Sequence, residues 1–340
     1  MDTAISNIIA AFYRLNEMQV QPLALGLINT TWTCVAQGKK YILQKVNTHV
    51  FKDPSLIDAN LRLLAFHLKQ YHPNYLFTAP VQGKSGETLC RVGDEYYRMF
   101  PFIDGSHTID TVQTPQQAYE AAKQFGTFTA LLNEFDASKL NTTIPRFHDL
   151  AFRFEEFEQA AANGNKERIA ATANEIEIMY SHRGIVEKFI GFTHNPDTKK
   201  RVTHHDTKIS NVLFDKNDKG LCVIDLDTVM PGYFISDVGD MIRTYVCPVS
   251  EEENDLDKIV IREDFLSAVA EGYLSAMKPY LSSFEQEHFY FSGEVLIYMQ
   301  ALRFLADYLN CDVYYGSRYL NQNLVRAKNQ LKLLEQFRNR

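Results

Sequence analysis

The stretch Val202–Thr228, VTHHDTKISNVLFDKNDKGLCVIDLDT, decides how the fold of this chain is interpreted. It contains two short apolar runs, Val212–Phe214 and Leu221–Ile224, and the polar segment between them ends in Gly220. Apolar runs separated by Asp, Asn, Lys and Gly are typical of two strands joined by a turn. The stretch therefore predicts a β-hairpin that is preceded by a polar loop.

Three side chains that carry oxygen atoms are expected to meet at the open end of this hairpin. Asn211 precedes the first apolar run, Asp225 follows the second, and Asp206 lies five positions before Asn211. Carboxylate and amide oxygens are suitable ligands for a hard cation, and a carboxylate can also accept a proton from a hydroxyl nucleophile. The spacing therefore predicts a site that combines cation binding with general-base chemistry.

Length and composition limit the class of protein. The chain has 340 residues, of which 45% are hydrophobic, and this is enough for the cores of two lobes. A net charge of −7 argues against a nucleic-acid partner or an anionic membrane surface. The five cysteines are scattered without a CxxC pair, which indicates reduced thiols in a cytoplasmic protein.

The pattern of elements changes near residue 103. Before it, the sequence predicts mostly strands with inserted helices: helix 4–16, strands 20–25, 32–36 and 41–46, helix 54–70, and strands 87–92 and 96–100. After it, helices surround the hairpin, at about 114–133, 149–163, 166–182, 184–190, 262–278, 283–310 and 317–337. We expect an α+β protein with a β-rich lobe, residues 1–103, and a larger helical lobe, residues 104–340, separated by a cleft.

The loop and hairpin also resemble a known family. HHDTKISN (204–211) and VIDLD (223–227) are similar to the catalytic and metal-binding loops of small-molecule kinases with the protein-kinase-like fold, which include aminoglycoside phosphotransferases and choline kinases. GLINTTW (26–32), YILQKVNTHVFKDP (41–54) and RFLADYLNCDVYY (303–315) resemble stretches of the N-acetylhexosamine 1-kinase group. The resemblance implies a bilobal protein-kinase-like fold, the cofactors ATP and Mg²⁺, and transfer of a phosphoryl group to the anomeric hydroxyl of a sugar such as GlcNAc or GalNAc.

The resemblance also implies roles for individual residues. Asp206 would be the catalytic base, and Asn211 and Asp225 would be the metal ligands. Lys208 either neutralises the transferred phosphoryl group or is a solvated loop lysine. The ATP-binding residues would be Asn29, Thr30, Thr31, Lys45, Phe100, Phe102 and Lys208.

Within the first lobe, two points depend on which way the strand side chains face. Lys45 is the natural candidate to pair with phosphate, but strand alternation leaves open whether Lys45 or Gln44 faces the cleft. Helix 54–70 contains Asp58 but no Glu, so the partner of that lysine is also open. The segment 100–103 is expected to form the hinge that meets the adenine.

The acceptor would be bound by Asp206, Asp227, Arg303, Tyr314 and Trp32. Three of these residues, Asp227, Arg303 and Trp32, have an ordinary or alternative role beside that one. Asp227 could assist at the metal, and Arg303 with Asp307 could be a simple i, i+4 ion pair. Trp32 could be part of the core. Other acceptors on the same scaffold are choline, homoserine, methylthioribose and aminoglycosides, and a nucleotide-binding protein without catalysis is a further alternative.

Overall fold

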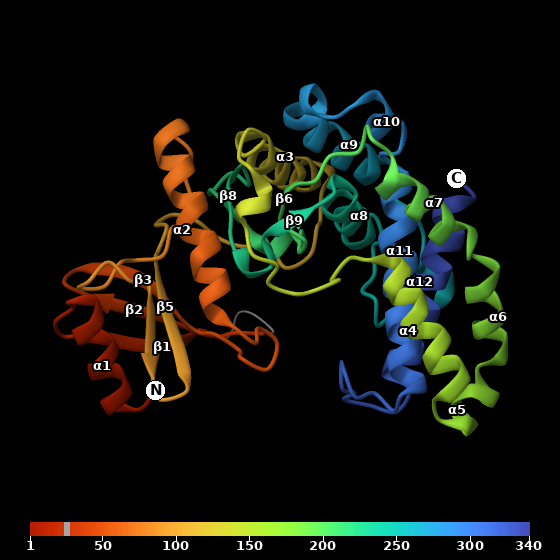
Figure 1. The fold of residues 1–340 in the computed structure, drawn as a ribbon, viewed down its shortest axis with the longest axis horizontal. Helices are drawn as coiled ribbons and strands as arrows, with labels where there is room; N and C mark the ends of the chain where they lie inside the picture. Colours follow the sequence, from red (N-terminus) through yellow and green to blue (C-terminus); the bar gives the residue numbers. More distant parts are fainter. Residues whose placement is uncertain (24–27) are drawn as a thin grey trace.

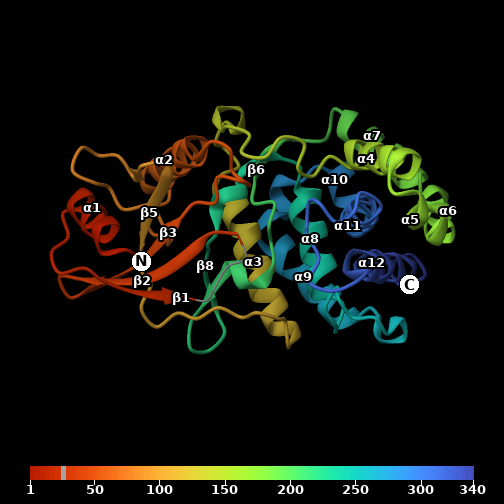
Figure 2. The same ribbon diagram turned by 90° about the horizontal axis from the view of Figure 1, so that it is seen from below.

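The computed structural model describes residues 1–23 and 28–340, and it shows two lobes (Figures 1 and 2). The N-terminus lies in the β-rich first lobe and the C-terminus at the far end of the helical second lobe. This is the α+β bilobal architecture that the sequence predicts. The expected bend at Gly26 lies outside the described residues.

The first lobe is built on a five-stranded antiparallel sheet of order β1-β2-β3-β5-β4. The strands are β1 Gln19–Leu23, β2 Thr30–Ala36, β3 Lys39–Lys45, β4 Leu89–Val92 and β5 Glu95–Pro101. Helix α1, Thr3–Tyr13, covers one face of the sheet, where Ile9 and Tyr13 pack with Cys34, Leu43 and Met99. The other face is directed at the second lobe.

Helix α2, Pro54–Tyr71, stands between the sheet and the second lobe (Figure 1). Asp53 caps it by accepting from the Ser55 N–H, with Pro54 at its first position. Its apolar stripe packs into the same core as the helices of the second lobe; the residues of that stripe are Ile57, Leu61, Leu64 and Leu68. The Asn60 amide nitrogen also donates to the carbonyl oxygens of Asn141 and Val229, at 2.9 and 3.1 Å.

The second lobe contains helices that pack around α11, which is buried along most of its length. The α-helices are α3 Pro115–Leu131, α4 Leu150–Asn163, α5 Lys166–Ala171, α6 Ala173–Ser181, α7 Gly184–His194, α8 Phe234–Tyr245, α9 Glu263–Met277, α10 Ser283–Glu287, α11 Phe291–Leu309 and α12 Gln322–Arg338. Short 3₁₀ turns are η1 Ala137–Lys139, η2 Ile209–Asn211, η3 Leu226–Thr228, η4 Leu256–Lys258 and η5 Lys278–Tyr280.

Two expected helices are each divided in the structure. The helix expected over 166–182 is α5 followed by α6, because the buried Thr172 donates its hydroxyl to the Arg168 carbonyl and ends α5. The helix expected over 283–310 is α10 followed by α11, with His288 as the C-cap of α10. Periodicity continued across both interruptions, so it did not reveal them.

The predicted hairpin is present as β7, Val212–Phe214, and β8, Gly220–Val223, paired antiparallel. A second pair, β6 Arg201–Thr203 with β9 Met230–Gly232, flanks the loop that precedes the hairpin. Across the described ranges, no helix is both long and apolar enough to cross a membrane.

A buried ion pair anchors the start of β6. Arg201 and Glu285 have side chains that are 2% and 1% exposed, and their two contacts are 2.6 and 2.8 Å long. Removing one partner leaves the other charge buried without compensation. We expect Glu285→Ala to lower the free energy of unfolding by about 3–5 kcal/mol in urea titrations. The exposed neighbour Glu287→Ala, on the same helix, should change it by less than about 0.5 kcal/mol.

Candidate active site

Helix α8 holds the polar loop before the hairpin in place. The Asp237 carboxylate, in the first turn of α8, accepts from the backbone N–H groups of His204 and His205, at 3.0 and 2.7 Å. Asp240 accepts from the Thr207 N–H at 2.8 Å. His205 has a φ of 67°, which is strained for a side chain of this size. The carboxylates of α8 therefore fix a loop conformation that the backbone alone would not favour.

Asp206, Asn211 and Asp225 come together at the hairpin end, as the spacing predicts. The Asn211 side-chain amide donates to the Asp206 carbonyl at 2.9 Å, and the Ile224 N–H donates to the Asn211 carbonyl at 2.8 Å. Lys208 lies between the two carboxylates, with its Nζ 2.9 Å from Asp206 Oδ2 and 3.9 Å from Asp225 Oδ2. Lys208 is thus a part of the site and not a freely solvated lysine.

The two carboxylates differ in their tendency to ionise. Burial by itself would raise the pKa of Asp206, but the Lys208 ammonium and further hydrogen bonds hold it below its ordinary value. Burial and then the charge of Asp227 raise the pKa of Asp225 to about 7. Asp206 is therefore the more readily ionised of the two carboxylates, and the ionised state is the one that a proton acceptor requires.

The donor groups at the hairpin end suit the coordination that Mg²⁺ requires. In the part of the chain that the structure describes, no three His, Cys, Asp or Glu side chains form a metal centre. Mg²⁺ bound beside a nucleotide needs only one or two protein ligands, because phosphates and water supply the rest. Asn211 uses its amide nitrogen internally, which leaves its oxygen for a cation, and the mutual repulsion of Asp225 and Asp227 favours positive charge nearby. The donor set fits.

The strand register settles which side chain of β3 faces the second lobe. Thr31, Gln44 and Arg98 are paired across β2, β3 and β5, so they lie side by side on one face. Arg98 contacts Asp227 of the second lobe, so this face is the one directed at the second lobe. Lys45 lies on the opposite face and pairs with Glu95. The expectation that Lys45 binds ATP is corrected, because alternation turns it away from the second lobe and puts Gln44 on the side that faces it.

Trp32 is also on the α1 side of the sheet. Its ring lies 6.5 Å from that of Tyr97, at the edge of the apolar cluster that contains α1. Trp32 therefore lies at the edge of the core, which is the alternative stated above. The expected contact of Trp32 with an acceptor is corrected, because strand alternation turns its side chain away from the second lobe.

Asp227 is held by the first lobe. Its carboxylate is almost fully buried, accepts from the Asn29 amide at 2.7 Å and lies 2.5 Å from Arg98 Nη1. Asn29 in turn accepts from the Asn47 N–H at 2.9 Å. Thr30 is the first residue of β2 and is exposed. The predicted contacts of Asn29, Thr30 and Thr31 with phosphate remain predictions.

The predicted hinge is the end of β5. Phe100 packs against the main core, and the Arg98 guanidinium lies 5.2 Å from its ring centroid. Phe102 donates its N–H to the Lys40 carbonyl at 3.2 Å, and the Lys40 ammonium lies 5.5 Å from the Phe102 ring. A contact of Phe100 or Phe102 with adenine stays a prediction.

Arg303 lies among aromatic rings beside the catalytic loop. Its guanidinium is 5.4, 5.7 and 5.4 Å from the rings of Phe147, Tyr314 and Tyr315. The Phe147 ring lies 6.4 Å from that of His205, the residue before Asp206. Within residues 1–23 and 28–340, no carboxylate oxygen is within 4.0 Å of the Arg303 guanidinium.

The simple ion pair between Arg303 and Asp307 is not formed. Asp307 instead accepts from the backbone N–H groups of Tyr314 and Tyr315, at 2.7 and 2.9 Å, and so fixes the turn after α11. Tyr314 is 67% exposed and its hydroxyl lies 3.4 Å from Arg303. Asp307 thus positions the aromatic groups that surround the arginine.

Two residues of the site were missed from sequence. Arg98 is a charge within the apolar run Tyr96–Phe100, and such a charge signals a buried partner. Phe147 lies in a loop without a regular pattern and carried no signal. Each was found only through the packing of distant segments.

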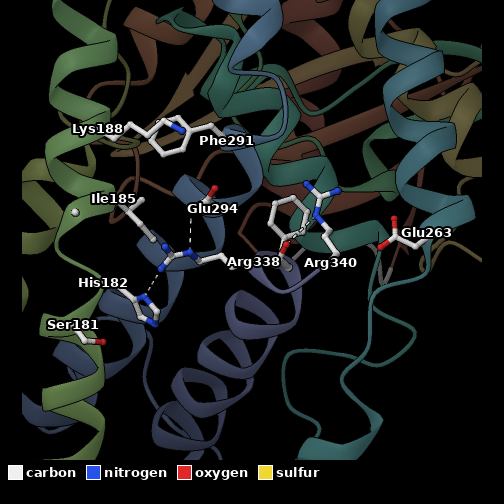
Figure 3. A pocket seen from close by; sticks show the side chains of 11 residues that line it. Ser181, His182, Ile185, Lys188, Glu263, Phe291, Glu294, Arg338 and Arg340 are labelled. Atoms are coloured by element: carbon white, nitrogen blue, oxygen red, sulfur yellow. Dashed lines mark hydrogen bonds and ion pairs between the residues drawn. The ribbon is translucent and has the colours of Figure 1, made fainter.

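Two cavities lie apart from the hairpin end. One, of about 840 Å³, is lined by residues of α7, α11 and α12, where Arg338 contacts Glu294 and His182 (Figure 3). The other, of about 440 Å³, lies behind the catalytic loop and borders His148, His205 and Ser236. Neither includes Asp206, Asn211 or Asp225 in its lining.

The buried His205 should make the protein sensitive to acid. Burial lowers its pKa to about 3, whereas in the unfolded chain it takes a proton below about pH 6.5. Unfolding therefore takes up a proton, and stability is lost as the pH falls through 6.5. We expect the stability advantage of wild type over His205→Gln to shrink by about 1.4 kcal/mol between about pH 7.5 and 5.5 in urea titrations.

Comparing the two proteins removes the contributions of carboxylates that are common to both. A difference for His205→Gln that does not change with pH would contradict the expectation, because it would show that this histidine has the same pKa in the folded and the unfolded chain.

The comparison with known proteins assigns the class. Residues 19–276 match the phosphotransferase enzyme family (APH), and the chain belongs to this family. Its fold is similar to that of a microcompartment-associated aminopropanol kinase, with a TM-score of 0.67, 16% identity, and coverage of 99% of this chain and 98% of the other.

Two further solved structures share the fold. One is a spectinomycin phosphotransferase in complex with ADP and spectinomycin, with a TM-score of 0.64, 13% identity, and coverage of 100% of this chain and 99% of the other. The second is a choline kinase from Cryptosporidium parvum Iowa II, with a TM-score of 0.61, 16% identity, and coverage of 99% and 97%. At these identities the likeness establishes the fold, and the acceptor has to be argued from the site.

Proposed function

We propose that the protein is an ATP-dependent sugar kinase of the phosphotransferase family, which phosphorylates the anomeric hydroxyl of an N-acetylhexosamine such as GlcNAc or GalNAc. The observation that carries the proposal is an ionised carboxylate, Asp206, paired with Lys208 at 2.9 Å beside the Asn211 and Asp225 oxygens. The family assignment supports phosphoryl transfer. The N-acetylhexosamine acceptor rests on the resemblance of stretches 26–32, 41–54 and 303–315 and on the charge of the acceptor side.

The proposed chemistry divides between three groups. Asp206 accepts the proton of the attacking hydroxyl, because its carboxylate stays ionised at neutral pH. Asn211 and Asp225 would hold Mg²⁺, which when bound neutralises charge on the phosphates. Lys208, between Asp206 and Asp225, supplies a positive charge close to the point of proton transfer.

The acceptor side favours a molecule without positive charge. Arg303 is partly buried against three aromatic rings and has no carboxylate partner within the described ranges. A cationic acceptor placed there would be repelled, whereas sugar hydroxyl or amide oxygens would accept hydrogen bonds from the guanidinium. The aromatic rings offer flat apolar faces to a sugar ring. This combination fits a neutral, polar ring compound.

A second candidate is a kinase of amino alcohols or aminoglycosides. Its support is the solved structures of similar fold, which are named as aminopropanol, choline and spectinomycin kinases or phosphotransferases. Aromatic rings such as Phe147 and Tyr314 could also surround an ammonium group. The charge of Arg303 is the feature that speaks against this candidate.

The two candidates are separated by measuring ADP release with a panel of N-acetylhexosamines, other sugars, choline, homoserine, methylthioribose and aminoglycosides. The proposal requires turnover with at least one N-acetylhexosamine and a 1-phosphate product by NMR. Turnover only with a cationic acceptor would replace the sugar by the second candidate. Nucleotide binding without turnover of any acceptor would indicate a non-catalytic protein.

Replacing the base should abolish most of the activity. We expect Asp206→Asn to lower kcat by about 10²–10⁴, because the amide cannot accept the proton. The matched control is Asp197→Asn, at an exposed aspartate that accepts no side-chain hydrogen bond, and it should retain the wild-type rate. An Asp206→Asn rate within about tenfold of wild type would remove Asp206 from its proposed role.

Arg303 should act on the acceptor and not on the nucleotide. We expect Arg303→Leu to raise the KM for the sugar by about 10- to 100-fold, the effect of losing one hydrogen bond from a charged donor. The KM for ATP should stay within about twofold. The control Arg318→Leu, at a side chain that is 77% exposed, should change neither value. Equal effects on both KM values would show that Arg303 has a structural role.

A further inference from the structure

An ion pair joins the two lobes at a buried point next to the metal-binding segment. Arg98 of β5 and Asp227 of η3 have side chains that are 4% and 3% exposed, and their charged atoms are 2.5 Å apart. Two buried charges in contact are costly to desolvate, and each is strongly destabilising when its partner is removed. A pair of this kind therefore constrains where the two segments lie relative to each other.

Gln44 fixes the direction in which Arg98 points. Its side-chain oxygen accepts from both Nε and Nη2 of Arg98, at 3.1 and 2.8 Å. The guanidinium also lies over the Phe100 ring. A planar group held by two hydrogen bonds and a ring face has little freedom to rotate. Gln44 therefore occupies the cleft-facing position of β3 as an acceptor that orients an arginine.

On the other side of the contact, the Asp227 carboxylate is held at both oxygens. Oδ1 faces Arg98 and Oδ2 accepts from the Asn29 amide, so both partners come from the first lobe. Asp227 lies two residues after Asp225, which has a φ of 58°, and η3 begins between them. The first lobe thus holds the segment whose backbone sets the position of the Asp225 carboxylate.

Helix α2 does not provide this connection. Its only carboxylate, Asp58, hydrogen-bonds to Thr88 within the first lobe. Lys45 of β3 pairs with Glu95, also within the first lobe. Among the described residues, a pair between a β3 lysine and an α2 carboxylate is therefore not formed, and the connection from sheet to metal-binding segment runs through Arg98.

We propose that Arg98 is a positioning residue, which, oriented by Gln44, holds the Asp225–Asp227 segment from the first lobe and so couples lobe closure to the geometry of the metal ligand. This inference rests on the proposed function for its consequence in catalysis. Its structural content, that Arg98 orders η3, does not depend on which acceptor is used.

The first test measures order without activity. In the protein without ligands, hydrogen–deuterium exchange at Leu226–Thr228 should be at least about tenfold faster in Arg98→Met than in wild type. The reason is that local opening of this segment breaks the ion pair in wild type, whereas in the variant there is no ion pair to break. Gln44→Leu, which keeps the charge pair but loses its orientation, should give a smaller increase at the same residues. Arg91→Met, at a side chain that is 62% exposed on neighbouring β4, is the matched control and should leave η3 unchanged.

The second test separates positioning from contact with phosphate. In EDTA, Arg98→Met should lower the affinities for ATP and AMP by the same factor, because a positioning residue does not touch the additional phosphates. With Mg²⁺, kcat should fall by about 10²-fold, the effect of a misplacement of about 1 Å. The Mg²⁺ concentration that gives the half-maximal rate should rise in the same variant. Arg98→Lys, which keeps the positive charge, should restore part of the kcat and part of the Mg²⁺ dependence.

Two results would overturn the inference. One is an exchange rate at η3 that is the same in a folded Arg98→Met protein as in wild type. If Arg98→Met does not fold, an unchanged exchange rate in Gln44→Leu would overturn the inference instead. The other is a loss of ATP affinity with AMP affinity intact, which would make Arg98 a phosphate ligand. A wild-type protein that turns over no acceptor would refute the proposed function, but the exchange result would still decide the role of Arg98.

Discussion

The hydrogen bonds that Asp237 accepts from the backbone of the catalytic loop are the interaction on which the site depends. A single carboxylate at the start of α8 accepts from the successive N–H groups of His204 and His205, and the second of these residues takes a positive φ. Backbone strain of this kind costs roughly 1–3 kcal/mol and persists only where the surroundings enforce it. Because α8 packs against the central helix α11, the position of Asp206 is ultimately set by the core of the second lobe.

Around that fixed loop, the site is an arrangement of acids and bases drawn from both lobes. Asp206 and Asp225 share Lys208 from their own lobe, whereas Asp227 is neutralised by Arg98 from the other. Lys208 and Arg98 each offset part of the repulsion between these carboxylates. Part of the charge compensation of the site therefore comes from the sheet of the first lobe.

The sequence predicted the parts of this arrangement that depend on local order. The lobes follow from the pattern of elements along the chain, and the hairpin and the meeting of Asp206, Asn211 and Asp225 follow from spacing, because two strands joined by a turn bring their flanks together. The phase of β3 did not follow, since alternation allows either Lys45 or Gln44 to face the cleft and only the register with Arg98 decides it. The interruption at Thr172 and the approach of Phe147 to Arg303 likewise depend on tertiary contacts that no local pattern encodes.

Helix α2 has a consequence for how the two lobes can move. Its apolar stripe is part of the second lobe's core, and Asn60 bonds the backbone of Asn141 and Val229. Any movement of the sheet relative to the second lobe would therefore take place against a stationary helix. If α2 moved away from the second lobe, the buried hydrogen bonds of Asn60 would be broken. Each polar group left without a partner would cost roughly 1–3 kcal/mol.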